Sequence, residues 1–272
     1  MKYQRVIRQI SFIILILFSL KLSAQETIVK KIMLVNSAPS FIINVSGIYS
    51  VSMLELGGAY NSDFQSDLVK KGESFGTRGG YGVSVSSKIR LHKTSRLWFT
   101  QSLSYNNIKS YMLSQSKTNS DNGKADYKCF TGSLGAEYNF LPNYSIKIFT
   151  GAEVNASLIS GSMDVWNQIP GDPYNTDSYK ILPSFRIGFA LTAGTNYMLS
   201  RSIGVNFTVK YNCLNALLRS AEGNNSDKEF RLRDGNSSNG LLFSGNKQFS
   251  FFSVSAGLSL YFGIAQKKYR LN

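Results

Sequence analysis

The sequence has few of the residue types on which metal proteins and disulfide-rich proteins depend. It contains one histidine and two cysteines among 272 residues, which is too few for a disulfide framework or for a His–Cys metal site. Charged residues make up 17% of the chain, compared with ~25% in a typical soluble domain. After residue 24, no stretch reaches the ~18 uninterrupted apolar residues of a membrane helix. These absences argue against several common classes of protein.

The N-terminal residues have the pattern of an export signal. Lys2, Arg5 and Arg8 form a basic region, Ile10–Leu20 is apolar, and Leu22–Ala24 offers a cleavage site. An uncleaved membrane anchor is the alternative, but the apolar run is too short to span a bilayer as a helix. We therefore expect residues 1–24 to be a cleaved signal peptide.

The net charge of +14 falls to about +10 when the four basic residues of the signal peptide are removed. Basic proteins often bind nucleic acid, but here the basic residues are scattered and the chain is exported. We expect no nucleic-acid partner. Outer-membrane lipid, and polyanionic lipopolysaccharide near basic loop residues, are the partners that the charge and the export signal favour.

Seven segments contain apolar and polar residues in alternation, with a period of two, and an eighth, Phe41–Met53, does so less regularly. In Ile203–Cys213, for example, Val205, Phe207 and Val209 fall on one face, while Asn206 and Lys210 fall on the other. At about 9–11 residues or slightly more, each segment has the length of a tilted membrane-crossing strand. The expected strands are Phe41–Met53, Tyr81–Leu91, Leu97–Asn107, Tyr127–Phe140, Ser145–Leu158, Leu182–Tyr197, Ile203–Cys213 and Phe249–Phe262.

The connections between these segments alternate between short and long. Three tight turns lie at residues 92–96, 141–144 and 199–202, and long polar segments lie at about 59–80, 108–126, 160–181 and 214–248. Short turns on one side and long loops on the other are typical of outer-membrane barrels. The sequence thus predicts an all-β, eight-stranded antiparallel up-and-down transmembrane β-barrel, with short periplasmic turns and long extracellular loops. The barrel would cover residues 41–263, after a periplasmic lead-in at 25–40 and before a basic periplasmic tail at 264–272. Because Glu55 would continue an apolar face, the first strand should end or bulge before it.

Alternation alone does not say which face points outward, since a soluble lipocalin-like barrel has its apolar face inside. The polar faces carry little charge and many small residues, which suits a narrow interior better than a soluble exterior. Aromatic residues of the apolar faces also gather near both strand ends, as they do at the two membrane interfaces. These residues are Phe99, Phe140, Tyr197 and Phe262 on the turn side, and Tyr81, Tyr105, Phe130, Phe185 and Tyr211 on the loop side.

No catalytic, cofactor-binding or metal-binding residues are predicted. His92 lies in a short turn on the expected periplasmic side without an acidic neighbour, whereas lipid-modifying barrel enzymes need a general base beside a Ser or an acid near the outer leaflet. Asp172 and Asp234 are expected as turn residues, with a weak calcium site in a loop as the alternative. Cys129 and Cys213 lie on strands that are not neighbours, so both are expected as free thiols.

A pore is the other functional alternative. The interior of an eight-stranded barrel is just wide enough to be filled by its own side chains. The expected inward residues include the long side chains of Lys88, Arg90, Trp98, Phe149 and Arg186. These would block a channel, so we expect a barrel that does not conduct.

Two contacts inside the barrel follow from the expected turns. The turn at 92–96 pairs Leu91 with Leu97, which places Arg90 opposite Trp98 and suggests a cation–π contact. The turn at 141–144 suggests an ion pair between Glu137 and Lys147. The alternative is that each of these two residues finds water or backbone carbonyls.

The segment Gly257-Leu258-Ser259-Leu260-Tyr261-Phe262-Gly263 resembles the last strand of the small outer-membrane barrels of Bacteroidota, which are called OmpA-like or PorT-like. Ala24-Gln25 is similar to the signal cleavage junction common in that phylum. The resemblance implies that the barrel-assembly machinery reads the final strand. The blocked interior favours a non-enzymatic structural or surface-interaction role through the long loops, whereas the resemblance alone implies a role as an accessory of a secretion or uptake complex. The chain departs from the family pattern because residues 264–272 continue past the terminal aromatic residue.

Overall fold

The structure is a computed structural model, and it describes residues 32–36, 38–57, 74–92, 96–110, 123–169, 172–220, 224–226, 228–235, 237–239, 242–244, 246–264 and 266–270. The expected signal peptide lies outside the described residues, as do parts of all four long segments. In the described ranges, no helix is both long and apolar enough to span a membrane.

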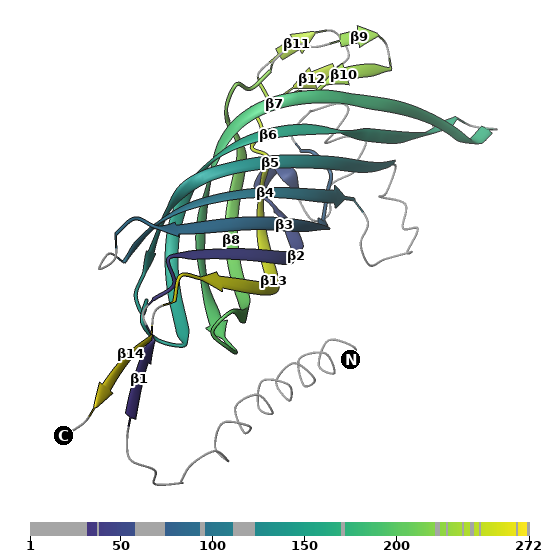
Figure 1. Cartoon of the computed structure of the whole chain (residues 1–272). Coiled ribbons are helices and arrows are strands. Elements are labelled where there is room, and N and C mark those ends of the chain that lie inside the picture. The colour runs from purple at the N-terminus through teal and green to yellow at the C-terminus, as the bar shows by residue number, and fades with distance from the viewer. Residues whose placement is uncertain are drawn as a thin grey trace. The chain divides into compact units, whose positions relative to one another are not determined.

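Eight antiparallel strands form a closed barrel (Figure 1). Each strand pairs with its neighbours in sequence, and β2 pairs with β13 to close the sheet. The strands are β2 (Phe41–Met53), β3 (Gly79–Arg90), β4 (Leu97–Lys109), β5 (Gly123–Asn139), β6 (Ile146–Ile169), β7 (Asp172–Met198), β8 (Ile203–Leu217) and β13 (Ser250–Phe262). Closure leaves no unpaired edge in the body of the barrel. The expected fold class is confirmed.

The alternation predicts the strands well where they cross the barrel. β2 has the expected bounds, and a short 3-10 helix, η1 (Leu54–Leu56), follows it and contains Glu55. The strand therefore ends before Glu55, as expected. At the end of the barrel with the short connections, here called the turn end, most observed strand bounds differ from the expected ones by no more than one residue.

The opposite end, here called the loop end, differs from the expectation. Much of the expected loop at 160–181 is strand, because β6 and β7 continue as a long hairpin to Ile169 and Asp172. The expected loop at 214–248 begins with the end of β8 and contains four short strands: β9 (Asn224–Ser226), β10 (Glu229–Arg231), β11 (Ser237–Asn239) and β12 (Leu242–Ser244). Strand pairing depends on main-chain hydrogen bonds, so it can continue where the apolar alternation stops. This explains why hydropathy placed these ends too early.

The two faces of the barrel are as different as the sequence predicts. Exterior side chains are apolar and exposed; for example, Val83 is 61% exposed, Leu103 57% and Val154 62%. The expected aromatic residues face outward at both ends. The interior carries buried polar residues such as Asn44 and Asn155. A soluble barrel would reverse this arrangement, so the lipocalin-like alternative is wrong.

The pairing of β3 with β4 leaves no room for a side chain at Gly80. A Cβ atom built on Gly80 would lie 1.9 Å from the carbonyl oxygen of Asn107. Gly47, in contrast, has no heavy atom within 4 Å of such a Cβ. Only the first of these two glycines is required by close packing.

The residues that precede and follow the barrel form a separate two-stranded sheet. In it, β1 (Ile32–Asn36) pairs antiparallel with β14 (Gln266–Arg270), with Ile32 opposite Arg270. Neither segment alternates in a way that predicts a strand. The pairing joins part of the expected lead-in to part of the expected basic tail.

Candidate functional site

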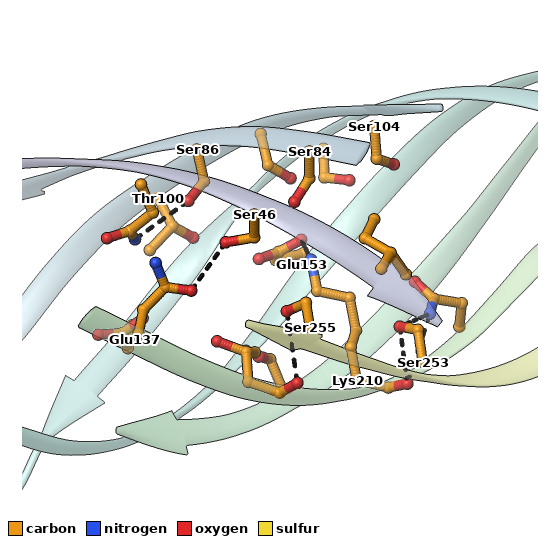
Figure 2. Close-up of a pocket in the computed structure, with 18 of the residues that line it drawn as sticks. Ser46, Ser84, Ser86, Thr100, Ser104, Glu137, Glu153, Lys210, Ser253 and Ser255 are labelled. Atoms are coloured by element: carbon orange, nitrogen blue, oxygen red, sulfur yellow. Dashed lines mark hydrogen bonds and ion pairs between the residues drawn. The ribbon is translucent and has the colours of Figure 1, made fainter. Parts of the chain in front are cut away.

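The middle of the barrel interior contains a small polar cavity of about 70 Å³ (Figure 2). Its wall consists mainly of serine, threonine and asparagine side chains from the inward faces of the strands. A single water molecule needs roughly 10–15 Å³ of such space. The cavity therefore has room for a few water molecules but not for a solute of the size that porins conduct.

Two buried ion pairs border this cavity. Lys88 Nζ lies 2.6 Å from a carboxylate oxygen of Glu137, and Lys210 Nζ lies 2.8 Å from a carboxylate oxygen of Glu153. The Lys88 and Glu137 side chains are 6% and 3% exposed. Lys88 Nζ also lies 3.4 Å from the centre of the Phe149 ring. Each of these four charges thus has an opposite charge beside it, which offsets the desolvation cost of burying an ion.

The expected ion pair between Glu137 and Lys147 is wrong. The observed register places Glu137 opposite Gly151, because the connection between β5 and β6 is longer than a tight turn at 141–144. Lys147 Nζ instead donates hydrogen bonds to the carbonyl oxygens of Pro142 and Tyr144, at 2.8 and 2.7 Å. The alternative that the sequence left open, a lysine held by backbone carbonyls, is the observed one.

The expected register of β3 and β4 is confirmed, with Arg90 opposite Trp98. Both residues are on the inward face, and Trp98 is fully buried. The expected cation–π contact between them is wrong, because in this part of the described lumen the cation over an aromatic ring is Lys88. Trp98 packs instead with Ile42 and Tyr261, and this apolar cluster fills the turn end of the lumen.

A larger apolar cluster fills the loop end of the lumen. It combines inward strand residues with residues from the segments that follow β2, β8 and β12. Phe75, Tyr127 and Phe249 form its aromatic centre, with ring centroids 5.1–5.7 Å apart. The other members are Leu56, Ile108, Ala125, Cys129, Ile159, Met163, Ile181, Leu214, Leu232 and Phe251. Cys129 and Cys213 are both buried free thiols, as expected.

A buried ion pair holds the loop-end segment 218–249 against the barrel. Arg186, on the inward face of β7, donates from Nε and Nη2 to the two carboxylate oxygens of Asp234, both at 2.8 Å. The same carboxylate accepts hydrogen bonds from Asn215 Nδ2 and the backbone N–H of Ser220, at 2.7 and 2.9 Å. Asp234 is fully buried. We call the described residues of segment 218–249 the cap.

Lys247 provides a second attachment of the cap. Its Nζ lies 4.6 Å from the centre of the Phe75 ring, and its backbone carbonyl accepts a hydrogen bond from Asn215. Burial is the main reason that the pKa of Lys247 is lowered from 10.5 to about 8; Asp234 acts in the opposite direction and Arg233 in the same direction. The cap therefore contains a lysine that titrates close to physiological pH.

Sequence reasoning found Arg186 as an inward residue but missed its partner. Asp234 was expected as a turn residue, and its role as a buried anion depends on the path of the cap, which no local pattern encodes. One signal was available: an inward arginine in an apolar lumen requires an anion, and the loops are the nearest source.

The sequence predicted no catalytic or metal-binding residues, and the structure bears on this only through His92 and the grouping of metal ligands. His92 is an exposed turn residue, and no three His, Cys, Asp or Glu side chains are grouped to hold a metal ion in the part of the chain that the structure describes. The described lumen is filled at both ends by apolar clusters. Two ion pairs and the small polar cavity lie between them.

Comparisons with known proteins find only distant similarities. No family model matches the chain, and no curated protein matches it. Among solved structures, Neisserial surface protein A is 15% identical with a TM-score of 0.44, covering 83% of this chain and 99% of its own. OprG from Pseudomonas aeruginosa is 13% identical with a TM-score of 0.40, covering 86% and 98%. The outer-membrane protease OmpT from Escherichia coli is 12% identical with a TM-score of 0.34, covering 87% and 99%. These likenesses carry no information about a ligand or an activity of this chain.

Proposed function

We propose that the protein is a non-enzymatic and non-conducting β-barrel of the outer membrane, and that its loop end contacts a surface ligand or an envelope partner. The observation that carries the proposal is the filled lumen. The Trp98–Tyr261 cluster occupies the turn end, the Phe75–Tyr127–Phe249 cluster occupies the loop end, and two ion pairs lie between them.

The exterior supports a location in the membrane. An apolar belt around a closed sheet is unfavourable in water, whereas lipid is its natural solvent. In the proposed orientation the short turns are periplasmic and the long segments are extracellular. The refolded protein should migrate faster before boiling than after it on a detergent gel, and a protein that is fully soluble without detergent would contradict the membrane location.

Planar-bilayer recording tests the closed lumen. We expect no steady conductance from the wild-type protein, because among the described residues an apolar cluster fills the lumen at each end. A steady open conductance would refute the proposal and favour the small-solute porin. The variant Trp98→Ala, which shortens the turn-end cluster while leaving the cap intact, should also stay closed because the loop-end cluster remains.

Exposed basic side chains of the cap support a polyanionic surface ligand, and we propose lipopolysaccharide. Lys228 and Arg231 are exposed cap residues. The double variant Lys228→Gln/Arg231→Gln should bind lipopolysaccharide micelles more weakly and with less salt dependence than wild type. Arg96→Gln, which removes an exposed cation at the turn end, is the matched control. Equal weakening by both would contradict a role of the cap.

The final-strand pattern supports two further proposals. One is that the barrel-assembly machinery inserts the chain through β13, and the other is that the protein belongs with the Bacteroidota OmpA-like or PorT-like barrels. A role as an accessory of a secretion or uptake complex rests on that resemblance. Deleting the gene from its host and measuring the surface proteins that depend on it would test the accessory role.

A further inference from the structure

Five polar side chains on five neighbouring strands form an arc at the turn end of the lumen, which we call the turn-end arc. They are Arg90 on β3, Trp98 on β4, Asn139 on β5, Lys147 on β6 and Asn196 on β7. Arg90 is opposite Trp98, Lys147 is opposite Asn196, and Asn139 is opposite Phe149, two residues from Lys147. The strand pairing therefore places these side chains side by side at one level of the barrel.

The arc has hydrogen-bond donors without acceptors. Trp98 Nε1, Asn139 Nδ2 and Asn196 Nδ2 are buried and have no partner among the described residues, and one acceptor of the arc, Asn196 Oδ1, has none either. All three residues are at most 1% exposed. Buried donors are normally paired, so three in one arc indicate that an acceptor binds there.

The arc also has two positive charges without a carboxylate. Lys147 Nζ contacts only the carbonyl oxygens of Pro142 and Tyr144 among its described hydrogen-bond partners, and Arg90 is the second positive charge of the arc. The described lumenal carboxylates of Glu137 and Glu153 are each paired with another lysine. Two neighbouring cations of this kind favour an anion.

We infer that the turn-end arc binds a small oxyanion of the phosphate class. Such an anion accepts several hydrogen bonds at once, which suits the three unpaired donors, the lysine and the planar fork of an arginine. Arg90 is only partly buried, so solvent reaches the arc at β3, beside the apolar cluster of Ile42, Trp98 and Tyr261. Water could satisfy the three donors, but it would leave the buried charge of Lys147 without a counterion.

Tryptophan fluorescence tests this inference directly. The chain has two tryptophans, Trp98 and Trp166, so Trp166→Phe leaves the arc residue as the single reporter. Inorganic phosphate, titrated into this refolded variant at constant ionic strength and pH, should change the Trp98 emission with a saturable curve. Removing one charge, in Arg90→Gln or Lys147→Met, should weaken the apparent affinity about tenfold or more.

The matched control is Lys109→Gln, which removes an exposed cation at the loop end and should leave the titration unchanged. Arg90→Gln keeps the test valid if Lys147→Met does not refold, because Arg90 is the less buried of the two. A linear or absent response, equal weakening in Lys109→Gln, or saturation by chloride with no preference for phosphate would each overturn the inference.

Discussion

Removing the carboxylate of Asp234 should release the cap from the barrel. In Asp234→Ala, the guanidinium of Arg186 loses both of its charged hydrogen bonds and keeps only the carbonyl oxygens of Phe185 and Leu232. Asn215 and Ser220 lose an acceptor at the same time. Because the Arg186 side chain is only 5% exposed, water cannot replace these contacts while the cap stays closed.

The magnitude follows from the burial. Breaking a buried ion pair by removing one partner costs about 3–5 kcal/mol, since it leaves an uncompensated charge. The structure has a cheaper route than global unfolding, which is to open the cap and expose Arg186 to water. The loss should therefore be seen mainly as cap opening. In Arg186→Met/Asp234→Ala both charges are absent, and at least about 1.5 kcal/mol of the single-variant losses should be recovered.

Limited trypsin digestion, followed by mass spectrometry, measures the opening. Cleavage at Arg219, Arg231 and Arg233 should become much faster in Asp234→Ala than in wild type, and should slow again in the double variant. Glu229→Gln, which removes one partner of an exposed ion pair with Lys180, is the control and should change stability by less than about 1 kcal/mol. Equal digestion of Asp234→Ala and wild type, or strictly additive losses, would show that the Arg186–Asp234 ion pair does not hold the cap against the barrel.

Three further predictions concern the lumen, the cap and the sheet. In urea unfolding of the refolded protein, Glu137→Gln and Lys88→Met should be coupled, whereas Glu137→Gln and Lys147→Met should be additive, because Glu137 contacts Lys88; coupling to Lys147 would contradict the register. The lowered pKa of Lys247 means that the unfolded state binds more protons than the folded state between pH 8 and 10.5. The stability of the cap should therefore rise with pH in that window, and Lys247→Met should flatten the rise. A fall in stability over this window would contradict the burial of Lys247. Gly80→Ala should lower the unfolding free energy by roughly 1–3 kcal/mol through overpacking against Asn107, while Gly47→Ala should be nearly neutral, and equal effects in denaturant melts would contradict the close approach of β3 and β4.

The fold could be predicted from the sequence because the polarity of each strand residue indicates whether its side chain points into the lumen or outward. In a strand, a single residue's polarity says which face it occupies, and the short turns then pair the strands. The turn at 92–96 gave the correct partner for Arg90. The turn at 141–144 did not give the correct partner for Glu137. A connection can be a few residues longer without any change in the alternation, and here the longer connection pairs Glu137 with Gly151 and not with Lys147.

The contacts that define the candidate site join residues that are far apart in the sequence, and a local sequence pattern does not predict such contacts. Asp234 reaches Arg186 from 48 residues away, and Lys88 reaches Glu137 from a strand that is not its neighbour. The inward direction of Lys88, Glu137 and Arg186 was predictable, but the pairing across the lumen was not. The extension of β6 and β7 was also missed, because beyond the apolar belt neither face needs to be apolar.

The closing pair of the barrel joins the first and last strands, β2 and β13, along thirteen residue pairs from Phe41–Phe262 to Met53–Ser250. The earliest strand to be synthesised must therefore wait for the latest before its own backbone groups are paired on both sides. A chain that stops before β13 does not form a smaller barrel; it leaves β2 and β8 as two open edges, which lipid does not tolerate. Loss of the last strand should thus act as an all-or-none checkpoint on assembly, and not as a graded loss of stability.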